Sequence, residues 1–195
     1  MDLDTAILDC QNNIFATPVW GFYLNTEKYH VSDYIEYINE MYENQPSVKK
    51  SNYGGWQSHD DLHKEGIFQE LKNSIDHVVN KCVPNTKIES LWANVNNHKD
   101  FNMQHNHEGI LSGVFYLKVP ENSGNLVLVN PKPKMNHCYY SKTLSQYIPS
   151  LNHDFVIKPE PLAVVIFPSW LEHYVEPNLS KSSRISVSFN IEIKK

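Results

Sequence analysis

The chain has 195 residues, of which 41% are hydrophobic and 20% are charged. This length is typical of one compact domain, and the apolar share is large enough to bury a core, which argues against a repeat array and excludes a wholly disordered chain. The 17 basic residues are outnumbered by 22 acidic ones, and no basic run is longer than the terminal Lys194-Lys195. We therefore expect neither nucleic acid nor an anionic membrane as a partner.

The three cysteines, Cys10, Cys82 and Cys138, are widely spaced and form no Cys-x-x-Cys pair. An odd number at this spacing argues against a disulfide framework or a thiolate zinc finger and is typical of a reducing compartment. The N-terminus lacks the basic stretch and apolar run of a signal peptide, and no apolar stretch approaches the roughly 20 residues that span a bilayer. The sequence predicts a cytoplasmic protein without a membrane segment.

The first part of the chain mixes extended and helical patterns. Residues 14–24 are rich in aromatic side chains and predict an extended strand. The apolar side chains of residues 34–41 recur at helical spacing and predict an amphipathic helix of about three turns. A second helix is predicted over residues 67–82, and the turn formers of residues 50–65 separate the two helices.

After residue 85 the pattern changes to short, β-branched segments separated by Pro, Asn, Ser and Gly, which predict strands. The predicted strands are residues 87–96, 110–119, 125–130, 154–158, 162–167, 172–176 and 183–193. Helices followed by strands, with no helix between the strands, favour an antiparallel sandwich or barrel over a parallel α/β sheet.

The fold expected from this order is mainly β with packed helices. It is a double-stranded β-helix, a cupin-like jelly roll, with the N-terminal helices packed against one sheet. No stretch of the chain has the composition of a linker. We therefore expect a single domain over residues 1–195, with a helical supporting region over about 1–84 and the jelly-roll core over about 85–195.

The chain has ten histidines, and three of them form a pattern that fits a metal site. His105 and His107 stand at positions i and i+2 of an extended segment, so their side chains point the same way and can reach one ion. His173 begins a predicted strand that a jelly roll brings close to them. Imidazole is a common ligand of iron, zinc, copper and nickel, so the three side chains are candidate ligands. The alternative is that His173 only forms a hydrogen bond in a turn.

The last predicted strand alternates polar and apolar residues, with Arg184 and Ser186 on its polar face. One interpretation is a solvated outer face. The other is a site for a small dicarboxylate, because a guanidinium pairs bidentately with a carboxylate and serine hydroxyls complete its hydrogen bonds.

Six stretches, taken in order, resemble one known family. They are IFATPVW (14–20), SNYGGWQS (51–58), WANV (92–95), HNHEGILSGVFYLKVP (105–120), IFPSWLEHYVEP (166–177) and RISVSFNI (184–191). The family is the Fe(II)- and 2-oxoglutarate-dependent oxygenases, and the similarity is greatest to a small bacterial and phage group related to prolyl hydroxylases. The stretches span nearly the whole chain, so the resemblance is to this group rather than to cupin barrels in general.

The resemblance implies a role for each matched residue. His105 and His107 take the positions of the proximal ligand pair of Fe(II), and His173 takes that of the distal ligand. Arg184 takes the place of the basic residue that binds the far carboxylate of 2-oxoglutarate, with Ser186 at the hydroxyl position that often accompanies it.

Two further cosubstrate contacts follow from the same resemblance. Tyr116 matches a tyrosine that in prolyl hydroxylases donates a hydrogen bond to the far carboxylate. Asn94 resembles a residue that hydrogen-bonds the chelated end of 2-oxoglutarate, and Asn96 shares its face of the strand.

One position departs from the family pattern. The common pattern is His-x-Asp or His-x-Glu, whereas this chain has His107 at the second position. A neutral imidazole in place of a carboxylate leaves the metal site one unit more positive, which should alter metal affinity and redox behaviour. Glu108 is adjacent, but its parity places it on the other side of an extended strand.

The function that the resemblance implies is a dioxygenase that uses Fe(II), 2-oxoglutarate and molecular oxygen to hydroxylate a C–H bond. The relation to prolyl hydroxylases favours a peptide or protein side chain as the primary substrate, which the sequence does not identify. Two other functions stay open: a metal-binding cupin-like protein that does not use 2-oxoglutarate, and a non-catalytic binding domain. A homodimer formed through edge strands also stays open.

Overall fold

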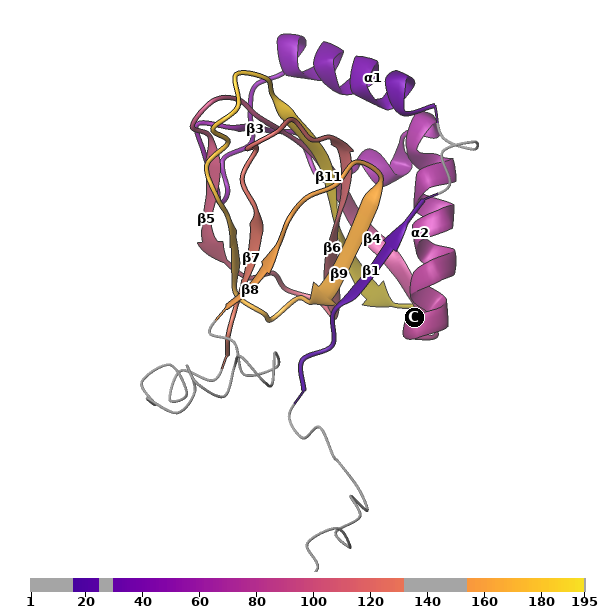
Figure 1. The fold of residues 1–195 in the computed structure, drawn as a ribbon. Coiled ribbons are helices and arrows are strands. Elements are labelled where there is room, and N and C mark those ends of the chain that lie inside the picture. The colour runs from indigo at the N-terminus through magenta and orange to yellow at the C-terminus, as the bar shows by residue number, and fades with distance from the viewer. Residues whose placement is uncertain (1–15, 25–29, 132–153, 195) are drawn as a thin grey trace, which may run out of the picture.

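The computed structural model describes residues 16–24, 30–131 and 154–194, and these form two antiparallel sheets that face each other (Figure 1). The large sheet has the strand order β1 (Trp20–Tyr23), β9 (Ala163–Pro168), β6 (Leu111–Lys118), β11 (Arg184–Ile193), β4 (Thr86–Asn96) and β3 (Trp56–Gln57). The small sheet has the order β2 (Asn52–Tyr53), β5 (Phe101–His105), β10 (His173–Val175), β7 (Leu126–Val129) and β8 (Asp154–Ile157).

Two helices pack on the outer side of the large sheet, away from the small one (Figure 1). They are α1 (Val31–Asn44) and α2 (Gln69–Cys82), and two short 3-10 helices, Leu62–Lys64 and Gly66–Phe68, precede α2. Each helix buries apolar side chains three or four residues apart, which places them on one face: Tyr34, Ile38 and Met41 in α1, and Leu71, Ile75 and Val79 in α2. The prediction of N-terminal helices against one sheet is confirmed.

The large sheet is apolar on its helix side and polar on its other side. Along β11, Ile185, Val187, Phe189 and Ile191 join the core that the helices cover. The residues between them therefore face the small sheet. Arg184 is only 2% exposed and Ser186 only 6%. A solvated outer face for this strand is thus wrong, because the polar face of β11 is enclosed between the two sheets.

A hydrogen bond between α2 and β4 fixes the strand that carries Asn94. The carboxylate of Asp76 accepts a hydrogen bond of 2.7 Å from the backbone N–H of Ile88. Asn80, one turn further along α2, donates 2.9 Å to the carbonyl of Thr86 and accepts from its N–H. These side-chain contacts hold the start of β4 against the helix.

Most predicted strands are present within a few residues of their expected bounds, but β5 (Phe101–His105) was not predicted as a strand. Its sequence, FNMQH, has no β-branched residue, and its pairing partners are distant in the chain: Asn102 pairs with Asn52 in β2, and His105 with His173 in β10. The strands β2 and β3 lie in the stretch predicted as turns and have two residues each.

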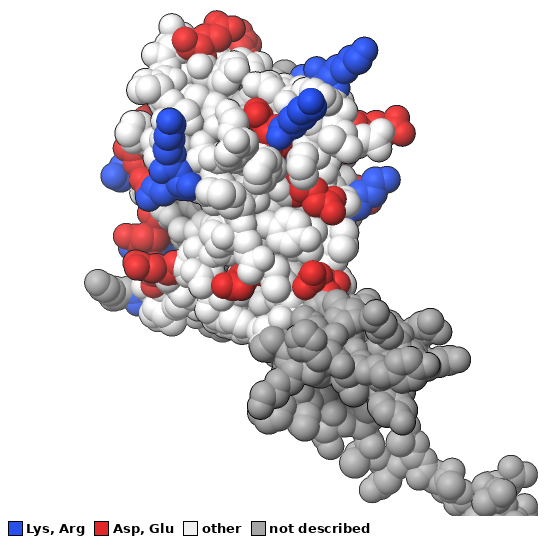
Figure 2. Space-filling model, turned by 90° about the vertical axis from the view of Figure 1, so that its left-hand side faces the viewer, with Lys and Arg blue, Asp and Glu red and all other residues white. Residues whose placement is uncertain are grey.

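The distribution of charged side chains on the surface fits the sequence, which has no long run of basic residues. In Figure 2, which shows the side that carries β5, β7 and β8, the described acidic and basic side chains are scattered over a mostly uncharged surface. Within the described ranges no helix is long and apolar enough to cross a membrane. Cys82 is exposed and free of a disulfide, whereas Cys10 and Cys138 lie outside the described residues.

Gly113 of β6 gives a test of the helix-side core. A Cβ at this position would lie 2.4 Å from Cζ of Phe189 and 2.7 Å from the carbonyl oxygen of Val165, so neither neighbour leaves room for it. We expect Gly113→Ala to lower the free energy of unfolding by about 1–3 kcal/mol, the usual cost of overpacking. Urea unfolding measures it, and Gly66→Ala is the control because no atom lies within 4 Å of its Cβ position. Equal stabilities of the two variants would contradict the packing.

Candidate metal centre

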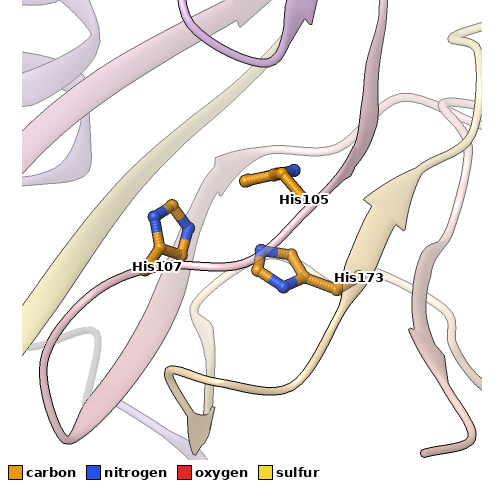
Figure 3. A group of neighbouring side chains, drawn as sticks. All are labelled: His105, His107 and His173. Atoms are coloured by element: carbon orange, nitrogen blue, oxygen red, sulfur yellow. The ribbon is translucent and has the colours of Figure 1, made fainter.

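The structure brings three imidazoles together between the sheets (Figure 3). His105 ends β5 and pairs directly with His173, which begins β10. His107 lies two residues beyond the end of β5. One ring nitrogen from each of the three lies within 4.8 Å of the others, and Figure 3 shows the three rings converging from two segments that are distant in the chain. A group of three imidazoles this close together could hold one metal ion.

His107 is outside the strand but is held by the turn after β9. Its backbone N–H donates 2.9 Å to the carbonyl of Ser169, and the N–H of Ser169 donates 3.1 Å to the carbonyl of Ile110. The same turn leads into β10 and His173. Both ligand-bearing segments are therefore attached to one another by backbone hydrogen bonds.

Backbone carbonyls set the tautomer of two of the imidazoles. Nδ1 of His105 lies 2.7 Å from the carbonyl of Met103, and Nδ1 of His173 lies 2.9 Å from that of Leu171. A carbonyl can only accept, so Nδ1 carries the proton in each ring, and the lone pair on Nε2 is left for a metal. Ser51 Oγ lies 3.3 Å from this Nε2 of His105.

The three imidazoles are neutral at pH 7. Burial lowers the pKa of each ring; together with the neighbouring His105 it lowers the pKa to about 4 for His107 and about 3 for His173. Only a neutral imidazole can bind a metal, so burial keeps these candidate ligands in the protonation state that an ion needs. Glu108 is exposed and does not belong to this group, which has no carboxylate among the described residues.

The imidazoles line a cavity of about 570 Å³ between the two sheets. Its floor is the polar face of the large sheet, where strand register places side chains in rows. Arg184 pairs with Asn96 in the first row, and Ser186 pairs with both Asn94 and Tyr116 in the second. All seven residues predicted for the site line this one cavity: Asn94, His105, His107, Tyr116, His173, Arg184 and Ser186.

Arg184 is a buried cation whose hydrogen-bond partners are all neutral. Its Nη1 donates 2.8 Å to the carbonyl of Ser123 and 3.3 Å to that of Gly124, and its Nη2 donates 3.0 Å to Oδ1 of Asn96. Its Nε is buried without any partner among the described residues. A buried charge without a counterion is costly, so this end of the cavity is complementary to an anion such as a carboxylate.

Tyr116 and Asn94 lie beside Ser186 in the row next to that of Arg184. Burial raises the pKa of Tyr116 to about 12, so its phenol keeps its proton and can donate a hydrogen bond. Asn94 Nδ2 donates 3.1 Å to Oγ of Ser188. The cavity thus offers donors for a carboxylate at one end and three nitrogen ligands for a metal at the other, which fits both a metal ion and 2-oxoglutarate.

Sequence reasoning did not anticipate the contact between Asn96 and Arg184, nor the polar residues at the opposite end of the floor. There, Ser112 Oγ donates 2.8 Å to Oδ1 of Asn190 and lies 2.9 Å from Oγ of Ser169. The alternation of β11 did contain a signal for Asn190, because it shares the polar face of Arg184. Ser112 and Ser169 carry no comparable signal.

Comparison with known proteins identifies the family. A family model described as "Putative 2OG-Fe(II) oxygenase", where 2OG is 2-oxoglutarate, matches residues 90–190. The chain belongs to this family. The predicted resemblance is confirmed, and with it the use of Fe(II) and 2-oxoglutarate by an oxygenase. No curated protein matches the sequence.

Solved structures of 2-oxoglutarate oxygenases share the fold of this family member. A Pseudomonas putida prolyl-4-hydroxylase is 12% identical, with a TM-score of 0.65 over 92% of this chain and 94% of that one. A Trichoplax adhaerens prolyl hydroxylase, in complex with a hypoxia inducible factor peptide fragment, is 12% identical, with a TM-score of 0.64 over 90% of this chain and 84% of that one. HygX from Streptomyces hygroscopicus, with nickel, 2-oxoglutarate and hygromycin B bound, is 11% identical, with a TM-score of 0.59 over 91% and 84%. The predicted double-stranded β-helix is confirmed.

The neutral imidazoles predict an acid-labile protein when no metal is bound. The pKa of His173 is about 3 in the folded chain and about 6.5 when unfolded, so unfolding takes up a proton between these pH values. The free energy of unfolding should therefore fall as the pH is lowered from about 6.5 towards 4. Thermal midpoints of the metal-free protein measure this.

His173→Asn should make the midpoint depend less steeply on pH over this range, whereas the exposed His77→Asn should leave the dependence as it is in the wild type. If the thermal midpoints of all three proteins depend on pH with the same slope, the pKa of His173 is not lowered by burial in the folded protein.

Proposed function

We propose that the protein is a 2-oxoglutarate-dependent hydroxylase in which His105, His107 and His173 bind Fe(II). The observation that carries this proposal is one cavity with three neutral imidazoles within 4.8 Å of one another and, on its floor, a buried Arg184 that has no acidic partner among the described residues. A metal-binding protein that lacks a cosubstrate has no evident use for such an arginine.

In this proposal the large sheet binds the far end of 2-oxoglutarate. The guanidinium of Arg184 and the hydroxyls of Ser186 and Tyr116 bind the far carboxylate, and Asn94 hydrogen-bonds the end that chelates the metal. One end of the ligand then lies beside the metal and the other beside Arg184, so each end meets a positive charge. These two contacts fix the direction in which the cosubstrate lies in the cavity.

Aromatic side chains pack against two of the imidazoles. The ring of Phe167 lies 4.7 Å from that of His173, and the ring of Trp92 lies 5.6 Å from that of His107, measured between centroids. The chemistry that a bound Fe(II) ion supplies in this family is the activation of oxygen, which couples decarboxylation of 2-oxoglutarate to oxidation of the substrate. The chain itself supplies the ligands and orients the cosubstrate.

We further propose a peptide or protein side chain as the primary substrate. The Trichoplax adhaerens prolyl hydroxylase of the same fold binds a peptide fragment, which supports this class, whereas HygX has hygromycin B bound. Trp170 is 53% exposed and follows Ser169, whose carbonyl holds His107, so it stands beside the metal centre where it can contact a substrate. Trp56, in contrast, is buried and donates a hydrogen bond to the carbonyl of Gln45, which makes it structural.

Truncating Arg184 tests the cosubstrate site. Anaerobic addition of Fe(II) and 2-oxoglutarate should produce a visible charge-transfer band, and its titration measures the affinity for 2-oxoglutarate. Arg184→Ala should weaken this affinity by about 2–5 kcal/mol, the range for removing one partner of a buried charge pair. The exposed Lys181→Ala is the control and should bind as the wild type does. Unchanged affinity in Arg184→Ala would refute the assigned role of this residue.

Removing one imidazole tests the metal centre. His173→Ala should reduce bound iron to a small fraction of one ion per chain, because two monodentate ligands hold Fe(II) weakly, while circular dichroism stays that of the folded barrel. Elemental analysis after gel filtration gives the stoichiometry, and His77→Ala, an exposed position on α2, should keep the full ion content. A metal-bound wild type that gives no band with 2-oxoglutarate would instead favour a cupin-like metal protein.

A band without release of succinate across a peptide library would favour the non-catalytic binding domain. Succinate formed with one peptide and not with its scrambled counterpart would support the hydroxylase and its substrate class.

A further inference from the structure

We propose that Asn96 is a positioning residue that holds the guanidinium of Arg184 for the ligand while leaving its positive charge uncompensated. The inference rests on the function proposed above, because it concerns the arginine that is proposed to bind 2-oxoglutarate. The positioning role explains why the residue beside Arg184 carries an amide and not a carboxylate.

The contacts of Arg184 hold both terminal nitrogens of its guanidinium by neutral acceptors. Nη1 and Nη2 are held by the carbonyls of Ser123 and Gly124 and by Oδ1 of Asn96, at 2.8, 3.3 and 3.0 Å. Nε has no partner in the described part of the chain. The neutral acceptors therefore orient the group without forming an ion pair, and the full charge stays available to an incoming carboxylate.

Asn96 is itself held in place from two sides. Its backbone carbonyl accepts 2.9 Å from Nδ2 of Asn178, a fully buried residue whose Nδ2 also donates 2.9 Å to the carbonyl of Ser182. In the strand ladder, Asn96 and Arg184 are direct partners between β4 and β11. The two side chains thus come from adjacent, rigid strands.

Gly55 leaves room for the Asn96 amide. A Cβ at Gly55 would lie 2.7 Å from Nδ2 of Asn96, so only a glycine leaves the amide room to stand there. With Nδ2 on the Gly55 side, Oδ1 faces the guanidinium and accepts from Nη2. In the opposite orientation, Nδ2 of Asn96 would face Nη2 of Arg184. Both nitrogens can only donate, so no hydrogen bond would form between them.

A carboxylate in place of this amide would have nearly the same shape but the opposite electrostatic effect. It would accept the same hydrogen bond from Nη2 and neutralise Arg184 with a buried ion pair. A 2-oxoglutarate carboxylate would then meet a neutral pair and a nearby like charge instead of a free cation. Ligand affinity should therefore fall, whereas the stability of the unliganded protein should not.

The test is Asn96→Asp, measured in two ways. We expect at least a tenfold loss of 2-oxoglutarate affinity in the anaerobic Fe(II) titration, and an unchanged or higher thermal midpoint of the metal-free protein. Asn97→Asp, at an exposed position, adds the same charge away from the cavity and should leave the affinity within twofold of the wild type. An Asn96→Asp protein that binds 2-oxoglutarate as the wild type does overturns the inference.

A second variant keeps the test decisive if Asn96→Asp does not fold. Gly55→Ala adds no charge but displaces the Asn96 amide from Arg184, so the affinity for 2-oxoglutarate should fall severalfold. Wild-type affinity in this variant would count against the role of Asn96.

Arg184→Ala separates this inference from the proposed function. If Arg184→Ala binds as the wild type does, the proposed cosubstrate site fails; if Arg184→Ala loses binding while Asn96→Asp and Gly55→Ala retain it, only the positioning role fails.

Discussion

The site depends on the register of β11 between β4 and β6. Because side chains alternate along a strand, the register that sends Ile185, Val187 and Phe189 to the helices also sends Arg184 and Ser186 into the cavity. A slip of one residue would bury the guanidinium against the helices and turn the apolar row towards the three imidazoles. Helix packing on one side of the sheet thereby determines which side chains line the cavity on the other.

The electrostatics of the cavity are incomplete without its ligands. Three imidazoles stay neutral because burial lowers the pKa of each, and Arg184 keeps its charge beside neutral acceptors only. A ferrous ion adds two positive charges at the same enclosed place. In the proposed complex, the two carboxylates of 2-oxoglutarate would offset two of the three positive charges of Fe(II) and Arg184.

Local pattern was enough to predict both helices, most strands and the approach of His105 to His173, because apolar periodicity and a jelly-roll order determine them. It did not predict β5, whose sequence lacks β-branched residues and whose pairing is made with β2 and β10. The contact between Asn96 and Arg184 was also missed. It depends on cross-strand register and on the close approach of Gly55, which are tertiary facts that no short stretch of sequence contains.

The hydrogen-bonded pairing of His105 with His173 has a consequence for how the small sheet moves. β10 is three residues long and lies between β5 and β7, so few backbone bonds keep this part of the sheet closed. An ion bound by His105, His173 and the His107 that follows β5 would link β5 to β10. It would raise the free energy needed to open these strands locally. Slow amide hydrogen exchange in β5 and β10 would then report metal occupancy directly, independent of any turnover.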